Sequence, residues 1–158
     1  MKGSIIKKIL LTLAGVFILI QFYRPEKNTG MAHTGQDITA TLEVPAAVMK
    51  ILETSCYDCH SNHTVYPWYT NIQPIGWWMQ DHVNEGKEEL NFSVFNSYKP
   101  KRQQRKLDEI AELVNKRAMP LPSYLYMHRD AKLSDEQIEV LGNWAASQKI
   151  IVPGTDSR

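Results

Sequence analysis

The chain carries a Cys-x-x-Cys-His motif at residues 56–60, and this motif holds its only two cysteines. Two thiols about one helical turn apart can each bond a vinyl group of haem, and the adjacent histidine then lies beneath the iron as its proximal ligand. We therefore predict that Cys56 and Cys59 attach one covalent haem c and that His60 ligates its iron. Such a chain is expected to fold around a flat, apolar cofactor.

Two other chemistries use the same residue types. A zinc site of Cys56, Cys59, His60 and His63 would crowd four ligands together, whereas zinc sites usually separate two ligand pairs along the chain. A redox dithiol of the thioredoxin kind belongs near a βαβ pattern, and no strand pattern surrounds this motif. Haem attachment is the favoured interpretation, and both alternatives stay open.

The N-terminal segment predicts where the haem would be. Residues 9–23 carry no charge and follow lysines at positions 2, 7 and 8. No small-x-small cleavage site comes after them, and from Ile5 the apolar segment approaches the ~20 residues that a bilayer requires. We predict an uncleaved signal anchor over residues 1–24, with its lysines in the cytoplasm and the domain in the periplasm. A cleaved signal peptide would leave the domain in the same compartment.

The rest of the chain is long enough for one domain and a tether. Residues 25–42 are polar and include two glycines, so a flexible linker is predicted there. The haem-binding domain is predicted over residues 43–150, and a flexible tail over residues 151–158. Lysine and arginine total 18 against 17 for aspartate and glutamate, a balance that does not indicate nucleic acid as a partner.

The spacing of apolar residues predicts an all-α domain. Pro45 suits the start of a first helix, Gly86 is expected to stop a second one, and Ser134 with Gln137 forms a capping box for the last. The expected helices cover residues 45–54, 77–86, 101–117 and 134–148. Residues 61–74, with two prolines, are expected to form a loop.

An electron-transfer haem normally has a second axial ligand, and Met119 is the predicted one. It follows the third predicted helix and precedes Pro120 and Pro122, so a rigid loop could present its sulfur to the iron. A thioether ligand also raises the reduction potential. Filling a gap in the core is the other common role of methionine. His82 is the alternative sixth ligand, and an open sixth site is a further alternative.

The surroundings of the motif are consistent with a haem pocket. Arg102, Arg105 or Lys106 could pair with haem propionates, although a solvated helix face is the favoured explanation for them. No arrangement typical of a hydrolase is present in the sequence. Five aromatic residues after the motif fit either a haem pocket or ordinary packing: Tyr66, Trp68, Tyr69, Trp77 and Trp78.

Several segments together resemble the bacterial haem-binding domain family. They are SCYDCHSNHT (55–64), YPWY (66–69), NIQP (71–74), DH (81–82), LNFS (90–93), MPLPSY (119–124), HRDAKLS (128–134) and Trp144. The resemblance covers most of residues 20–147, and QFYRPEKN (21–28) after the anchor is similar to members from Bacteroidetes-type bacteria. It implies a single-haem, membrane-tethered periplasmic cytochrome, similar in helix order to class I cytochromes c. Relatives joined to cytochrome c or peroxidase-type domains imply a redox partner protein of respiratory or peroxidase type.

The predicted function is one-electron transfer by a c-type cytochrome-like protein at the periplasmic face of the inner membrane. The alternative is a haem-based sensor or ligand-binding module with an open or displaceable sixth ligand. An enzyme such as a peroxidase is less expected, because the sequence offers one haem motif and no evident distal acid–base pair.

Overall fold

The computed structural model describes residues 2–151, and this part of the chain is helical without any strand. The predicted all-α class is therefore confirmed. The predicted tail lies outside the described residues except for Ile151. The helices are α1 (Lys2–Ile20), α2 (Ala46–Ser55), α3 (Tyr57–His60), α4 (Ile75–Glu89), α5 (Pro100–Asn115), α6 (Pro122–Leu125) and α7 (Asp135–Ser147), with 3₁₀ turns η1 (Ile38–Ala40), η2 (Trp68–Asn71), η3 (Phe92–Ser97) and η4 (Arg129–Ala131).

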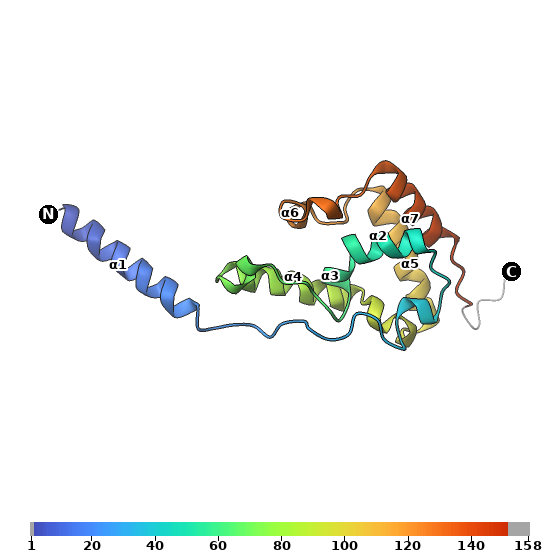
Figure 1. Ribbon diagram of the computed structural model, residues 1–158, viewed down its shortest axis with the longest axis horizontal. Helices are drawn as coiled ribbons and strands as arrows, with labels where there is room; N and C mark the ends of the chain where they lie inside the picture. Colours follow the sequence, from blue (N-terminus) through green and yellow to red (C-terminus); the bar gives the residue numbers. More distant parts are fainter. Residues whose placement is uncertain (1, 152–158) are drawn as a thin grey trace.

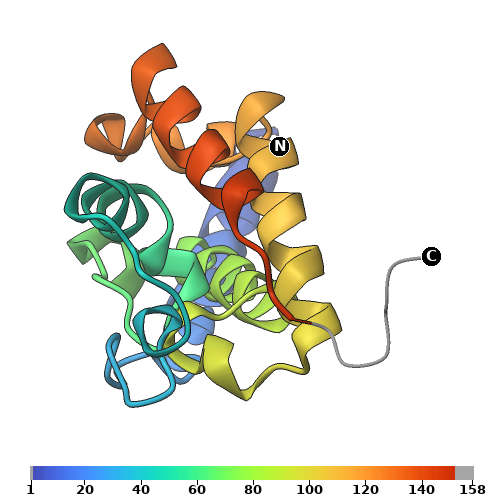
Figure 2. The same ribbon diagram turned by 90° about the vertical axis from the view of Figure 1, so that its right-hand side faces the viewer.

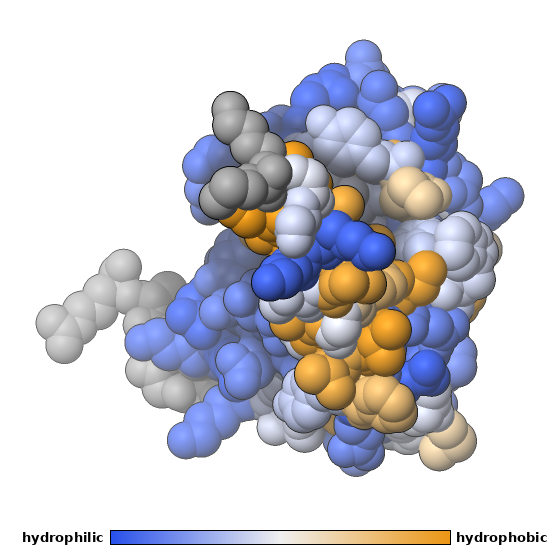
Figure 3. All heavy atoms as spheres, turned by 90° about the vertical axis from the view of Figure 1, so that its left-hand side faces the viewer, coloured by the Kyte–Doolittle hydropathy of each residue, from blue (hydrophilic) through white to orange (hydrophobic). Residues whose placement is uncertain are grey.

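The N-terminal helix α1 projects away from the other helices, which gather at the opposite side of the molecule (Figure 1). Its segment Gly3–Ile20 is apolar and long enough to cross a membrane, and none of it is buried. Hydrophobic atoms collect on the face of the molecule that α1 occupies, amid hydrophilic surroundings (Figure 3). A helix of this kind could serve as a membrane anchor, and a signal sequence has the same properties.

The core of the domain is built on α5 and α7, which lie side by side (Figure 2). Leu107 of α5 and Leu141 of α7 are fully buried, together with Leu52 of the neighbouring α2. The predicted capping box opens α7, with the Ser134 hydroxyl accepting from the backbone N–H of Gln137. The apolar stripe of α5 and the start signal of α7 thus produce the helices that they predict.

The helix α4 differs from its prediction, because it continues through Gly86 to Glu89. Glycine is needed here because another segment of backbone lies very close to it, and it does not end the helix. A Cβ at position 86 would lie 2.7 Å from the backbone oxygen of Cys59. The absence of a side chain therefore lets α3, with the Cys-x-x-Cys-His motif, approach the backbone of α4.

Part of residues 25–42, predicted as a linker, packs on the domain. The buried side chain of Asn28 donates to the carbonyl oxygen of Ser61 at 2.9 Å. Asp37 is only 1% exposed and accepts a hydrogen bond from the Tyr57 hydroxyl at 3.0 Å. The polar residues that give this segment the composition of a linker are the ones that fasten it to the domain.

Candidate haem-binding site

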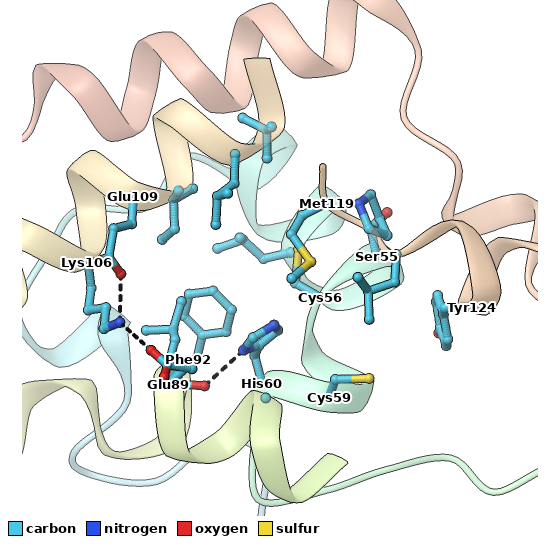
Figure 4. Close-up of a pocket in the computed structure, with 18 of the residues that line it drawn as sticks. Ser55, Cys56, Cys59, His60, Glu89, Phe92, Lys106, Glu109, Met119 and Tyr124 are labelled. Carbon is cyan, nitrogen blue, oxygen red and sulfur yellow. Dashed lines mark hydrogen bonds and ion pairs between the residues drawn. The ribbon is translucent and has the colours of Figure 1, made fainter. Parts of the chain in front are cut away.

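A cavity of about 370 Å³ lies between α3, α4, α5 and the segment that follows α5. This volume is in the range of pockets that hold cofactors. All three motif residues and Met119 line it (Figure 4). The other candidate sixth ligand, His82, lines it too, as do apolar side chains of three helices. The lining includes Leu52, Cys56, Cys59, His60, His82, Leu90, Phe92, Ile110, Leu113, Val114, Met119, Pro120, Leu121, Tyr124 and Leu141.

The motif reaches the cavity through a break between two helices. Cys56 ends α2 and begins α3, with φ −129° and ψ −39°. Its carbonyl oxygen then accepts the backbone N–H groups of Cys59 at 3.2 Å and of His60 at 2.9 Å. One short helical turn therefore brings both thiols and the imidazole to the same cavity, which is the spacing that two thioether bonds and one iron ligand require.

The two thiols do not resemble a redox-active pair. Both are free, and burial raises the pKa of Cys56 to about 12 and that of Cys59 to about 11. The charge of Cys59 raises the pKa of Cys56 further, and the charge of Asp58 does the same for the pKa of Cys59. Reactive dithiols have a lowered pKa instead. The arrangement suits neutral thiols held beside an apolar cofactor.

The zinc alternative finds no support in the geometry. Among residues 2–151, no three His, Cys, Asp or Glu side chains are grouped so as to hold a metal ion. His63 is exposed, and its Nδ1 lies 3.1 Å from the backbone oxygen of Gly30. His63 also does not line the cavity that Cys56 and His60 share.

His60 is oriented as a metal ligand would be. Its Nδ1 lies 3.0 Å from the carbonyl oxygen of Leu90, which can only accept, so Nδ1 carries the proton. The lone pair is then on Nε2. Burial lowers the pKa of His60, which favours the neutral ring that binds iron. Proteins usually fix the ring of a metal-binding histidine in this way, by a hydrogen bond from its other ring nitrogen to a backbone carbonyl.

Met119 is placed by the way in which α5 ends. Arg117 has a positive φ of 54°, and the N–H groups of Arg117 and Ala118 donate to the carbonyls of Val114 and Leu113. These two bonds form a Schellman motif, which turns the chain sharply after a helix. The half-buried Met119 follows the turn and lines the same cavity as His60 (Figure 4).

A hydrogen bond joins the Met119 segment to the haem motif. The Tyr124 hydroxyl donates to the Asp58 carboxylate at 2.7 Å, and Asp58 is one of the two variable residues of the motif. Burial raises the pKa of Tyr124, and the hydrogen bond and charge of Asp58 raise it further, so this hydroxyl keeps its proton. This hydrogen bond therefore fastens α6 to α3 beside the cavity.

The cavity also contains charged residues that the sequence did not single out as a group. Lys106 is 5% exposed at its side chain, and its Nζ contacts Glu89 at 3.0 Å and Glu109 at 2.6 Å (Figure 4). The solvated role weighed for Lys106 is therefore wrong. Its ion pair with Glu89 forms only when the fold brings the end of α4 to α5, for which no local sequence signal exists.

The aromatic residues after the motif do not line this cavity. Trp68 and Trp78 are exposed, and Tyr66 donates to the side chain of Gln80 at 2.7 Å. The aromatic walls of the cavity are Phe92 and Tyr124 instead. Of the two roles considered for these aromatic residues, the structure supports packing outside the cavity.

Comparison with known proteins identifies the family. A family model described as "Haem-binding domain" matches residues 15–147, most of the chain. No curated protein and no solved structure matched in the corresponding searches. The imidazole, the two thiols and the apolar cavity are a donor set and a space that fit haem. With its match over residues 15–147, this chain belongs to the haem-binding domain family.

Proposed function

We propose that the protein is a c-type haem protein that transfers single electrons. Cys56 and Cys59 would attach the haem, His60 would ligate its iron, and Met119 would ligate the opposite face. The observation that carries this proposal is the single cavity lined by all four residues. When bound, the haem iron supplies a one-electron couple.

The residues around the cavity have identifiable parts in this function. The Leu90 carbonyl holds the His60 ring in one tautomer and increases its basicity as a ligand. Apolar walls exclude water, and a methionine sulfur favours the reduced state of the iron. Together these features would give a potential higher than that of a solvent-exposed haem with two nitrogen ligands.

We further propose that the domain is held at the periplasmic face of the inner membrane by α1, and that it exchanges electrons with a redox partner protein of respiratory or peroxidase type. The apolar segment Gly3–Ile20 supports the proposed anchor. The periplasmic location of the domain is supported by the fact that haem is normally attached to such motifs outside the cytoplasm.

A sensor or ligand-binding module is the second candidate. It is favoured by the half exposure of Met119, whose segment is fastened to the motif by one side-chain hydrogen bond, and by His82 lining the same cavity. A methionine ligand held by so few contacts could be displaced from the iron by a small gaseous molecule.

Spectra of the purified protein and its Met119→Ala and His82→Ala variants distinguish these functions. We expect a haem that stays attached under denaturing conditions. We also expect a methionine–iron charge-transfer band that only Met119→Ala abolishes. The His82→Ala variant is the matched control from the same cavity.

Two results would contradict the assignment. A haem extracted by acid and solvent would exclude thioether bonds to Cys56 and Cys59. A high-spin wild-type spectrum, with immediate binding of carbon monoxide after reduction, would exclude Met119 as a ligand and support the sensor.

A further inference from the structure

The end of the domain nearest α1 carries an exposed apolar surface. We define the η2–α4 surface as Trp68, Ile72, Ile75 and Trp78, whose exposed fractions are 75%, 37%, 43% and 48%. Ile75 and Trp78 are three residues apart in α4 and so share one face of it. Because none of these residues lines the haem cavity, the haem site does not explain their exposure.

The chain just after α1 is bonded to Gln73 and Trp77, which are sequence neighbours of this surface. The Gln21 side chain donates to the carbonyl of Gln73 at 3.1 Å and accepts its N–H at 2.9 Å. The indole N–H of Trp77 donates to the carbonyl of Tyr23 at 2.8 Å. Figure 1 accordingly has the end of α1 beside the first turn of α4. The chain that leaves α1 is therefore attached to the domain next to the η2–α4 surface.

The residues that follow α1 have the chemistry of a membrane boundary. Phe22 and Tyr23 are 81% and 70% exposed. Arg24 and Lys27 help to line a second cavity of about 130 Å³ beside η2 and α4, where the Lys27 ammonium group donates to the Asn71 side chain at 2.9 Å. Aromatic rings with a polar edge prefer the headgroup layer, and arginine and lysine pair there with lipid phosphates.

We propose that the η2–α4 surface rests in the headgroup layer of a phospholipid bilayer. The inference depends on the proposed anchor, because a spanning α1 brings Gln21, and with it Gln73, to the membrane boundary. Trp68, Ile72, Ile75 and Trp78 then enter the interfacial region, and Arg24 and Lys27 face the phosphates. The domain thus has a second membrane contact besides α1, and its orientation on the bilayer is fixed.

Photo-crosslinking in nanodiscs tests this contact in the full, haem-loaded chain. The photoreactive amino acid p-benzoylphenylalanine replaces Trp68, Leu13 of α1 or Val140 of α7 in turn, in discs of phosphatidylcholine and phosphatidylglycerol. Val140 is the matched control, since it is apolar and 38% exposed on a helix remote from α1. We expect lipid adducts at positions 13 and 68, with a yield at 68 about tenfold above that at 140.

The outcomes separate this inference from the anchor itself. Adducts at position 13, with equal low yields at 68 and 140, would overturn the membrane contact and leave the anchor in place. No adduct at 13 or 68 would overturn both. With the label at 68, Gln21→Ala should reduce the lipid adduct severalfold, because it removes both bonds to Gln73. An unchanged yield would contradict the role given to this pairing.

Discussion

At the scale of single residues, Lys106 places a buried positive charge beside the haem site. Its ammonium group is buried at the cavity between Glu89 and Glu109, where water screens it poorly. The hydrogen bond from Lys106 lowers the pKa of Glu89. A cation in this position disfavours the oxidised iron, which carries one more positive charge than the reduced iron.

We predict that Lys106→Met lowers the reduction potential of the haem by on the order of tens of millivolts. The apolar chain of methionine keeps the packing while the charge is lost. Arg105→Met is the matched control, because Arg105 is a neighbouring, exposed cation that does not line the cavity. A redox titration that gives equal potentials for wild type and Lys106→Met would contradict this prediction.

The sequence makes some of these residues predictable and hides others. Cys56, Cys59 and His60 form a local pattern, since one helical turn brings them together whatever the rest of the fold does. Met119 could be proposed from its proline-rich context. Lys106 could not, because its ion pair with Glu89 joins two helices that only the folded chain brings together.

At the scale of elements, the contact between α3 and α4 at Gly86 holds the motif in place. An alanine Cβ there would meet the Cys59 backbone at 2.7 Å, and backbone cannot move aside as a flexible side chain can. Gly86→Ala should therefore destabilise the domain by roughly 1–3 kcal/mol, although alanine is the better helix former. Urea unfolding of the haem-loaded protein measures this change.

Gly142→Ala provides the comparison for Gly86→Ala. The nearest atoms to a Cβ at position 142 belong to the side-chain amide of Asn115, at 3.1 Å, which can rotate away. We expect a clearly smaller loss there, or a gain from helix propensity. Equal losses at both positions would show that the α3–α4 contact has no special importance.

The hydrogen bond between α6 and α3 is expected to keep Met119 at the iron. Tyr124→Phe removes only the hydroxyl that bonds Asp58, a loss of ~1 kcal/mol. The fraction of protein with the methionine ligand dissociated should then rise about fivefold, measured as faster carbon monoxide binding to the reduced protein. Tyr126→Phe, in an exposed side chain of the same segment, should leave the rate unchanged. A Tyr124→Phe rate equal to that of wild type would refute the role of this bond.

The elements themselves were predictable where their signals are local. The apolar stripe of α5 and the capping box of α7 need only neighbouring residues. The passage of α4 through Gly86 was not predictable, because its cause is Cys59, which is distant in sequence. The packing of residues 25–42 was likewise hidden, since Asn28 and Asp37 bond partners that only the folded chain brings near.

At the scale of the whole molecule, the domain is built around a space that its own side chains leave open. Helices α2, α5 and α7 all contribute apolar side chains to the walls of the cavity of about 370 Å³, so each loses packing when the cofactor is absent. Chain produced without haem should melt more than about 10 °C below the haem-loaded chain and should lose much of its near-UV circular dichroism. Coincident melting curves would contradict this view of the core.

The attachment of residues 25–42 also limits the reach of the domain. Asn28 is bonded to Ser61, the carbonyl of Gln36 accepts the N–H of Asn96 at 2.9 Å, and Gln21 is paired with Gln73. Little slack chain therefore remains between α1 and the helical core. If α1 spans the membrane as proposed, this short tether keeps the haem close to the bilayer. The haem travels at one height above the lipid, and only partners whose docking faces lie at that height meet it by lateral diffusion.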